Sequence, residues 1–143
     1  MPFLLDACVM QLRVPVSAGE LLDKISILEI KSERIDDAGK LVNIRRELDL
    51  LHEVWTEVAP DGDPQVDRLR EELKEVNEEL WEIEDAIREQ EFAGTFGPTF
   101  VELARSVYLT NDRRADLKKR LNLRLGSELV EEKSYSDYRP AGD

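Results

Sequence analysis

A stripe of polar side chains near the C-terminus consists of Asn111, Arg114, Lys118 and Asn122. Their spacing of three and four residues places them on one face of a helix. Four apolar residues share that face, namely Phe100, Ala104, Val107 and Leu125. A lysine on an apolar face needs partners, because desolvating an unpaired ammonium group costs several kcal/mol. The stripe therefore predicts either an internal polar network or one wall of a ligand site, with counter-charges from Glu84, Asp85 and Asp112.

A second stripe lies on the preceding helical stretch and holds Asn77, Trp81, Glu84 and Arg88. Trp81 offers a surface for stacking, and Asn77 and Arg88 offer hydrogen-bond donors. The alternative is a surface flank in which the charges pair and Trp81 packs. Lys24 and Lys31 share a flank of the first predicted helix, where a solvated face is the alternative. The three stretches predict a pocket for a small polar or anionic ligand, formed by Lys24, Lys31, Asn77, Trp81, Glu84, Arg88, Asn111, Asp112, Arg114, Lys118 and Asn122.

Two enzymatic sites compete with this binding site. Acidic residues within two helical turns could hold magnesium, as in all-helical nucleotide pyrophosphohydrolases. These residues are Glu78, Glu79, Glu82 and Asp85, for which a solvated acidic face is the alternative. A chorismate-mutase-like site would instead gather cations around a dicarboxylate. Its cations would be Lys24, Lys31, Arg88 and Lys118. The sequence indicates no cofactor, and we favour a non-enzymatic binding protein.

Composition restricts the partners and the compartment. The chain has 143 residues, a formal net charge of -12, one histidine (His52) and one cysteine (Cys8). This length suits one domain, and a lone histidine and a lone cysteine argue against metal sites built from histidine and cysteine and against Ser-His or Cys-His triads. The negative charge, without a basic stripe, argues against nucleic acid. No apolar run approaches the roughly 18 residues that cross a bilayer, so we expect a cytoplasmic protein without membrane insertion.

Apolar periodicity predicts an all-α fold, an antiparallel bundle of about four long helices after a short extended segment. Residues 10–16 alternate apolar and polar side chains, which predicts the extended segment. Ser17 and Glu20 have the form of a capping box, so the first helix should begin there. We expect it to run to about Asp37, with Gly39 as a left-handed stop.

Two faces of the first predicted helix are apolar. Ile27 and Ile30 lie opposite its main face, which predicts that they are buried between copies or under the N-terminal segment. We therefore expect a homo-oligomer. The second predicted helix repeats apolar residues at Leu41, Ile44, Leu48, Leu51, Trp55 and Val58. This heptad spacing favours coiled-coil packing.

Turn and capping residues delimit two further helices. Asp63 followed by Pro64 predicts the start of the third helix. Its apolar seam is Val66, Leu69, Leu73, Val76, Leu80, Ile83 and Ile87. Thr99 opens a second capping box for the fourth helix, which we expect to run unbroken to Leu125. The alternative is a break at Thr110, which could begin a separate helix.

The helical pattern also sets the predicted domain boundary. Residues 1–126 would form a single helical-bundle domain, and residues 127–143 a C-terminal extension with a disordered end. Within this extension, Glu131 to Tyr135 could act as a docking strap, because apolar neighbours could pack while the charges stay in water.

Three segments resemble a family of small bacterial proteins of unknown function. They are Val16-Ser17-Ala18-Gly19-Glu20-Leu21-Leu22-Asp23-Lys24, Asn77 with Leu80-Trp81-Glu82-Ile83-Glu84-Asp85-Ala86-Ile87-Arg88, and Asn111-Asp112-Arg113-Arg114 with Lys118 and Asn122. The resemblance implies no particular activity, and it implies an association with surface-polysaccharide or glycosyltransfer systems. From the residues and the resemblance together, we predict a self-associating accessory protein that binds a small ligand or a partner.

Overall fold

The computed structural model describes residues 10–139, and within this range the chain forms four α-helices and no strand. They are α2 (Ala18–Arg34), α3 (Ala38–Val58), α4 (Pro64–Ala93) and α5 (Pro98–Leu125). The predicted all-α class is confirmed. None of these helices is long and apolar enough to cross a membrane. Cys8 lies outside the described residues, as do residues 140–143 of the predicted disordered end.

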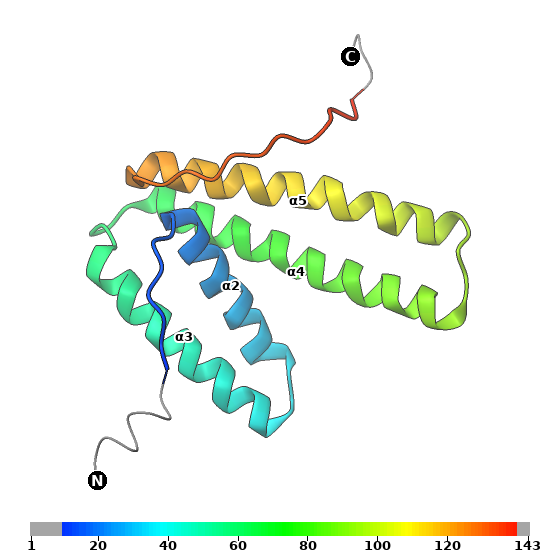
Figure 1. The fold of residues 1–143 in the computed structure, drawn as a ribbon, viewed down its shortest axis with the longest axis horizontal. Helices are drawn as coiled ribbons and strands as arrows, with labels where there is room; N and C mark the ends of the chain where they lie inside the picture. Colours follow the sequence, from blue (N-terminus) through cyan, green and yellow to red (C-terminus); the bar gives the residue numbers. More distant parts are fainter. Residues whose placement is uncertain (1–9, 140–143) are drawn as a thin grey trace.

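The helices pair into two antiparallel hairpins (Figure 1). The long helices α4 and α5 lie side by side, and the α2–α3 hairpin packs against one end of this pair. α2 is central because it contacts α3, α4 and α5, whereas the backbone of α3 approaches only that of α2 among these helices. After α5, residues 127–139 return alongside it without regular structure (Figure 1).

The start of α2 differs in part from the predicted capping box. The Ser17 hydroxyl accepts a hydrogen bond from the Glu20 amide at 3.1 Å, as predicted. The Glu20 carboxylate bonds Lys118 of α5. A tertiary partner has therefore taken the side chain that the capping box would use locally.

The predicted end of this helix was wrong. α2 ends at Arg34, and Asp37 caps the start of α3 by accepting from the Lys40 amide at 2.9 Å. Gly39 consequently lies in the first turn of α3 and is not a left-handed stop. A short aspartate side chain satisfies helix-start amides well, and this begins a new helix ahead of the glycine.

The third and fourth helices begin close to the predicted residues. Asp63 caps α4 and Pro64 opens it, and Gly94 ends it with a φ of 67°. α5 begins at Pro98 after Gly97, without a side-chain cap, so the predicted capping box at Thr99 was wrong. Proline suits the first helical position because its missing amide needs no partner there. α5 continues unbroken to Leu125, as predicted.

The hydrophobic core lies at the end of the molecule where α2 packs against both α4 and α5. The side chains of Leu73 and Leu121 are fully buried there. The remaining core residues are Leu21, Leu22, Ile25, Trp55, Val66, Leu69, Val76, Leu80 and Leu117. Fully burying one such side chain stabilises the fold by about 1.5 to 3 kcal/mol.

Several residues predicted to lie in apolar seams are outside this core. Val58 is 63% exposed at the end of α3, and Ala104 is exposed on α5. Phe100 and Val107 are only half-buried, because α2 ends before it reaches them. Ile30 is 1% exposed within one chain, so its burial needs no second copy.

Candidate functional site

The start of α2 lies against α5 at Gly19. A Cβ atom at this glycine would come within 2.5 Å of the Lys118 backbone oxygen, so only glycine allows the approach. The Gly19 amide donates to the Asn122 side-chain oxygen at 2.6 Å, and the Ala18 amide donates to the Ser127 hydroxyl at 3.1 Å. Asn122 and Ser127 thereby satisfy amides that a helix start leaves without partners.

Lys118 carries the buried charge of this contact and is 8% exposed. Its amine lies 2.7 Å from Glu20, 3.0 Å from Glu131 and 3.8 Å from Asp23. Burial alone would lower the pKa of Lys118, but hydrogen bonds with Glu20 and Glu131 outweigh it and raise the pKa above its ordinary value. Lys118 is therefore a compensated internal cation.

Asp23 of α2 contacts both α4 and α5, and it is 3% exposed. Asn77 of α4 donates to it at 2.9 Å and to Ser26 at 2.7 Å. On the α5 side, Asp23 lies 3.8 Å from Lys118 and 4.0 Å from Arg114. Within residues 10–139, no buried side-chain nitrogen or oxygen lacks a hydrogen-bond partner. We call the polar side chains that join α2, α4 and α5 the buried network. They are Glu20, Asp23, Ser26, Asn77, Arg114, Lys118 and Asn122.

The predictions from the sequence did not assign Asp23 to the site. The available signal was the set of cations on the predicted apolar face of α5, which needed an anion. An acidic residue on a chain with this many acids gives no local sign that it is buried.

A cavity of about 370 Å³ lies beside the buried network, between α2, α4 and α5. We call it the groove. It is lined by Ile27, Ile30, Asn77, Leu80, Trp81, Glu84, Asp85, Arg88, Asn111 and Arg114. Six of the residues predicted for a ligand pocket are among them, namely Asn77, Trp81, Glu84, Arg88, Asn111 and Arg114.

The groove combines an apolar floor with a charged rim. Ile30 and Leu80 are buried, and Trp81 is half-buried beside them. Arg88 pairs with Glu84 on the rim and its side chain is 70% exposed. The Arg34 guanidinium lies 6.0 Å from the Trp81 ring centre, a distance typical of a cation–π contact. This arrangement can hold a flat or apolar group below and a polar group above.

The other predicted site residues lie elsewhere. Lys24 is exposed and pairs with Glu47 of α3 at 3.8 Å. Lys31 is half-buried but does not line the groove. Asp112 lies beside Tyr138, whose pKa is raised by their hydrogen bond. Lys118 and Asn122 belong to the buried network and not to the groove wall.

The residue sets of the two enzymatic alternatives do not converge. Glu78 and Glu82 both pair with Arg34, at 3.4 and 3.5 Å. Glu79 pairs with Arg113 at 2.8 Å. Within the described part of the chain, no group of three or more His, Cys, Asp or Glu side chains could hold a metal ion. Of the four cations of the mutase-like site, Arg88 alone lines the groove.

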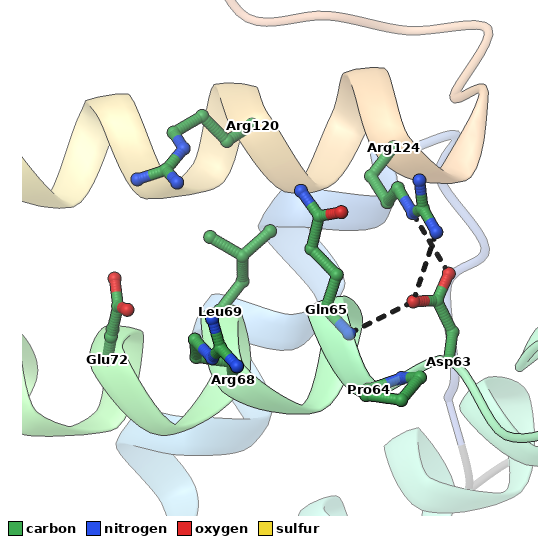
Figure 2. Close-up of a pocket in the computed structure, with 8 residues that line it drawn as sticks. All are labelled: Asp63, Pro64, Gln65, Arg68, Leu69, Glu72, Arg120 and Arg124. Carbon is green, nitrogen blue, oxygen red and sulfur yellow. Dashed lines mark hydrogen bonds and ion pairs between the residues drawn. The ribbon is translucent and has the colours of Figure 1, made fainter.

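A second cavity of about 370 Å³ lies between the start of α4 and the end of α5 (Figure 2). Figure 2 shows Arg124 directed at the Asp63 carboxylate, which it meets at 3.0 and 3.4 Å. This hydrogen bond lowers the pKa of Asp63, which also caps α4. The pair joins two helix ends, and we assign it a structural role.

A family model described as "Family of unknown function (DUF6165)" matches residues 12–140. No curated protein and no solved structure matches the chain. The extent of the match agrees with the resemblance to a family of unknown function. The individual motif segments and the association with surface polysaccharides stay predictions.

Proposed function

The chain belongs to this family of unknown function, and we propose that it is a self-associating accessory protein that binds a small polar ligand in the groove. The carrying observation is the groove itself, which lies open beside a buried network whose own polar groups are satisfied. A pocket with an apolar floor and a few converging polar groups is the usual form of a small-molecule site. We place the protein in the cytoplasm.

The lining residues define the ligand's chemistry. A ring or other flat apolar face would stack on Trp81 above Ile30 and Leu80. An anionic group would meet Arg88 and Arg114, which come from the facing helices α4 and α5. The volume of about 370 Å³ is near the lower end of common ligand pockets and suits a small molecule.

The test is a thermal melt with sugar nucleotides, sugar phosphates and dicarboxylates. A ligand at one hundred times its dissociation constant should stabilise the native protein by about 2.7 kcal/mol. Arg88→Gln should abolish that shift. Arg113→Gln is the matched control, because Arg113 also pairs with a glutamate of α4 but lies outside the groove lining. A shift that survives in Arg88→Gln, or none with any compound, would count against the groove as the site.

Self-association is proposed for the outer part of the α4–α5 pair. We call residues 81–93 and 98–109 the arm, and none of them is buried. Phe92 is 96% exposed and Phe96, in the connecting turn, is 55% exposed. Exposed aromatic residues at the end of a two-helix layer favour packing against a second copy.

Light scattering tests this surface directly. The wild-type chain should be an oligomer, and Phe92→Glu should reduce it to a monomer. Val42→Glu is the control, because Val42 is 66% exposed on α3, away from the arm. A monomeric wild type would remove self-association from the proposal and leave ligand binding untouched.

A further inference from the structure

The C-terminal segment places an acidic side chain among basic ones. Residues 127–139 return alongside α5 (Figure 1), and the Glu131 carboxylate lies 3.0 Å from the Lys118 amine. The small cavity at this point, about 40 Å³, is lined by Arg114, Ala115, Lys118, Lys119, Asn122, Glu131 and Lys133. Glu131 is the acidic member of that lining.

The surroundings of the Glu131 carboxylate favour an anion. Its hydrogen bond with Lys118 lowers the pKa of Glu131, and the charges of Lys133 and Arg114 lower it further. Two acids are nearby, but Glu20 and Asp23 approach Lys118 from α2. They hold the lysine in place while its remaining hydrogen-bonding capacity is directed at Glu131.

The attachment of Glu131 is weaker than that of Lys118. Its side chain is 52% exposed, whereas the side chain of Lys118 is 10% exposed. The next residue, Glu132, pairs with Lys119 at 3.3 Å, and the side chains of Glu132 and Lys119 are 72% and 48% exposed. Exposed ion pairs contribute little, typically below about 1 kcal/mol. Lys118 is therefore held rigidly, and the Glu131 side chain is held loosely.

We propose that Lys118, Arg114 and Lys133 form an oxyanion-binding site that Glu131 occupies in the free protein. A phosphate or carboxylate group of a ligand replaces the Glu131 carboxylate, whose side chain turns out into solvent while Lys133 stays beside the site. The site is separate from the groove except for Arg114, which lines both cavities. The proposal does not rest on the identity of the groove's ligand.

The test uses calorimetric titration with inorganic phosphate and, in a parallel experiment, with acetate, at constant ionic strength. Affinity for an occupied site is reduced by the fraction of molecules in which it is open. Glu131→Gln should therefore bind the preferred anion roughly tenfold more tightly than wild type. Glu132→Gln changes the net charge by the same amount at the neighbouring residue and should stay within about twofold of wild type. Comparison of the two titrations separates phosphate from carboxylate recognition.

Two further variants keep the test decisive. Lys118→Met should abolish binding in the Glu131→Gln background, and Lys133→Gln, an exposed change that leaves the helices intact, should weaken it. Equal affinities for Glu131→Gln and Glu132→Gln, or no binding by either, would overturn the proposal and leave Glu131 with a structural role alone.

Discussion

The long helices α4 and α5 run through two regions of the molecule. In the base, α2 packs on them, and in the arm they pack only on each other. In the base, Leu73 and Leu121 are fully buried, and Asn122 is 1% exposed. In the arm, half-buried side chains such as Ile87 and Leu103 are the most covered. Two helices alone cannot enclose a core, and a third layer is needed to exclude water. The difference shows that α2 decides which part of the α4–α5 pair becomes an interior.

The groove lies at the border between these regions. Ile27 and Ile30 come from the second half of α2, and Trp81 follows Leu80, the last buried residue of α4. Towards the base, Lys118 and Asn122 of the polar stripe on α5 are buried and hydrogen-bonded. Towards the arm, Asn111 of the same stripe is half-buried and lines the groove. A binding site at such a border has a rigid side and an accessible side.

The largest expected difference between the regions concerns their acidic residues. Asp23→Ala should lower the free energy of unfolding by about 2 to 4 kcal/mol, because Asn77, Arg114 and Lys118 lose a buried partner. Glu84→Ala in the arm should change it by less than about 0.5 kcal/mol, since the Glu84–Arg88 pair is exposed. Urea unfolding of both variants measures the contrast. Similar losses would mean that the buried network is no more structural than the arm's surface.

A smaller difference is expected between two glycines. Gly19→Ala should lower the free energy of unfolding by about 1 to 3 kcal/mol, because the added methyl group meets the Lys118 backbone. Gly97→Ala, at the far end of the arm, should cost no more than about 0.5 kcal/mol, since nothing lies within 4 Å of its Cβ position. Thermal melts at neutral pH compare them. An unchanged melting temperature for Gly19→Ala would show that α2 does not pack this closely on α5.

The smallest effect concerns acid. Asp63 and Glu131 stabilise contacts of the base, and their pKa values are lowered from 3.8 and 4.5 in the folded state. A lowered folded pKa adds stability above the unfolded value, and that stability is lost as pH falls through the folded value. Unfolding followed from about pH 6 to pH 2 should therefore show a shallower decline for Asp63→Asn and for Glu131→Gln than for wild type. An identical slope in these variants would assign the acid sensitivity to other carboxylates.

Much of the helical architecture could be predicted locally. Asp63 and Pro64 begin α4, Gly94 ends it, and Gly126 follows α5 with a φ of 64°. These positions depend on side chains within a few residues of the helix end, which is why the sequence is sufficient. The errors at Gly39 and Thr99 arose where a neighbouring residue, Asp37 or Pro98, was the better local start.

The polar site could be predicted only in part. Spacing alone placed Asn77, Trp81, Glu84 and Arg88 along one stripe of α4, and they share the groove with Asn111 and Arg114. Lys118 was correctly expected to need counter-charges, but these are Glu20, Asp23 and Glu131, and not Glu84, Asp85 or Asp112. Glu20 lies 98 residues from Lys118 along the chain, and Glu131 lies 13 residues away, beyond the end of α5, so no helical periodicity links either of them to it.

The sequence by itself determined the helices, their apolar faces and the polar interruption on α5, because periodicity sets the direction of each side chain around a helix axis. Only the tertiary structure decided which stretch of each face is covered. α2 ends at Arg34, so Lys118 is enclosed while Phe100 and Val107, on the same predicted face, are left half-buried. The close approach at Gly19 sets where α2 lies on α5. The distance between two packed helices depends on the side chains of both surfaces, so neither segment of the sequence determines it alone.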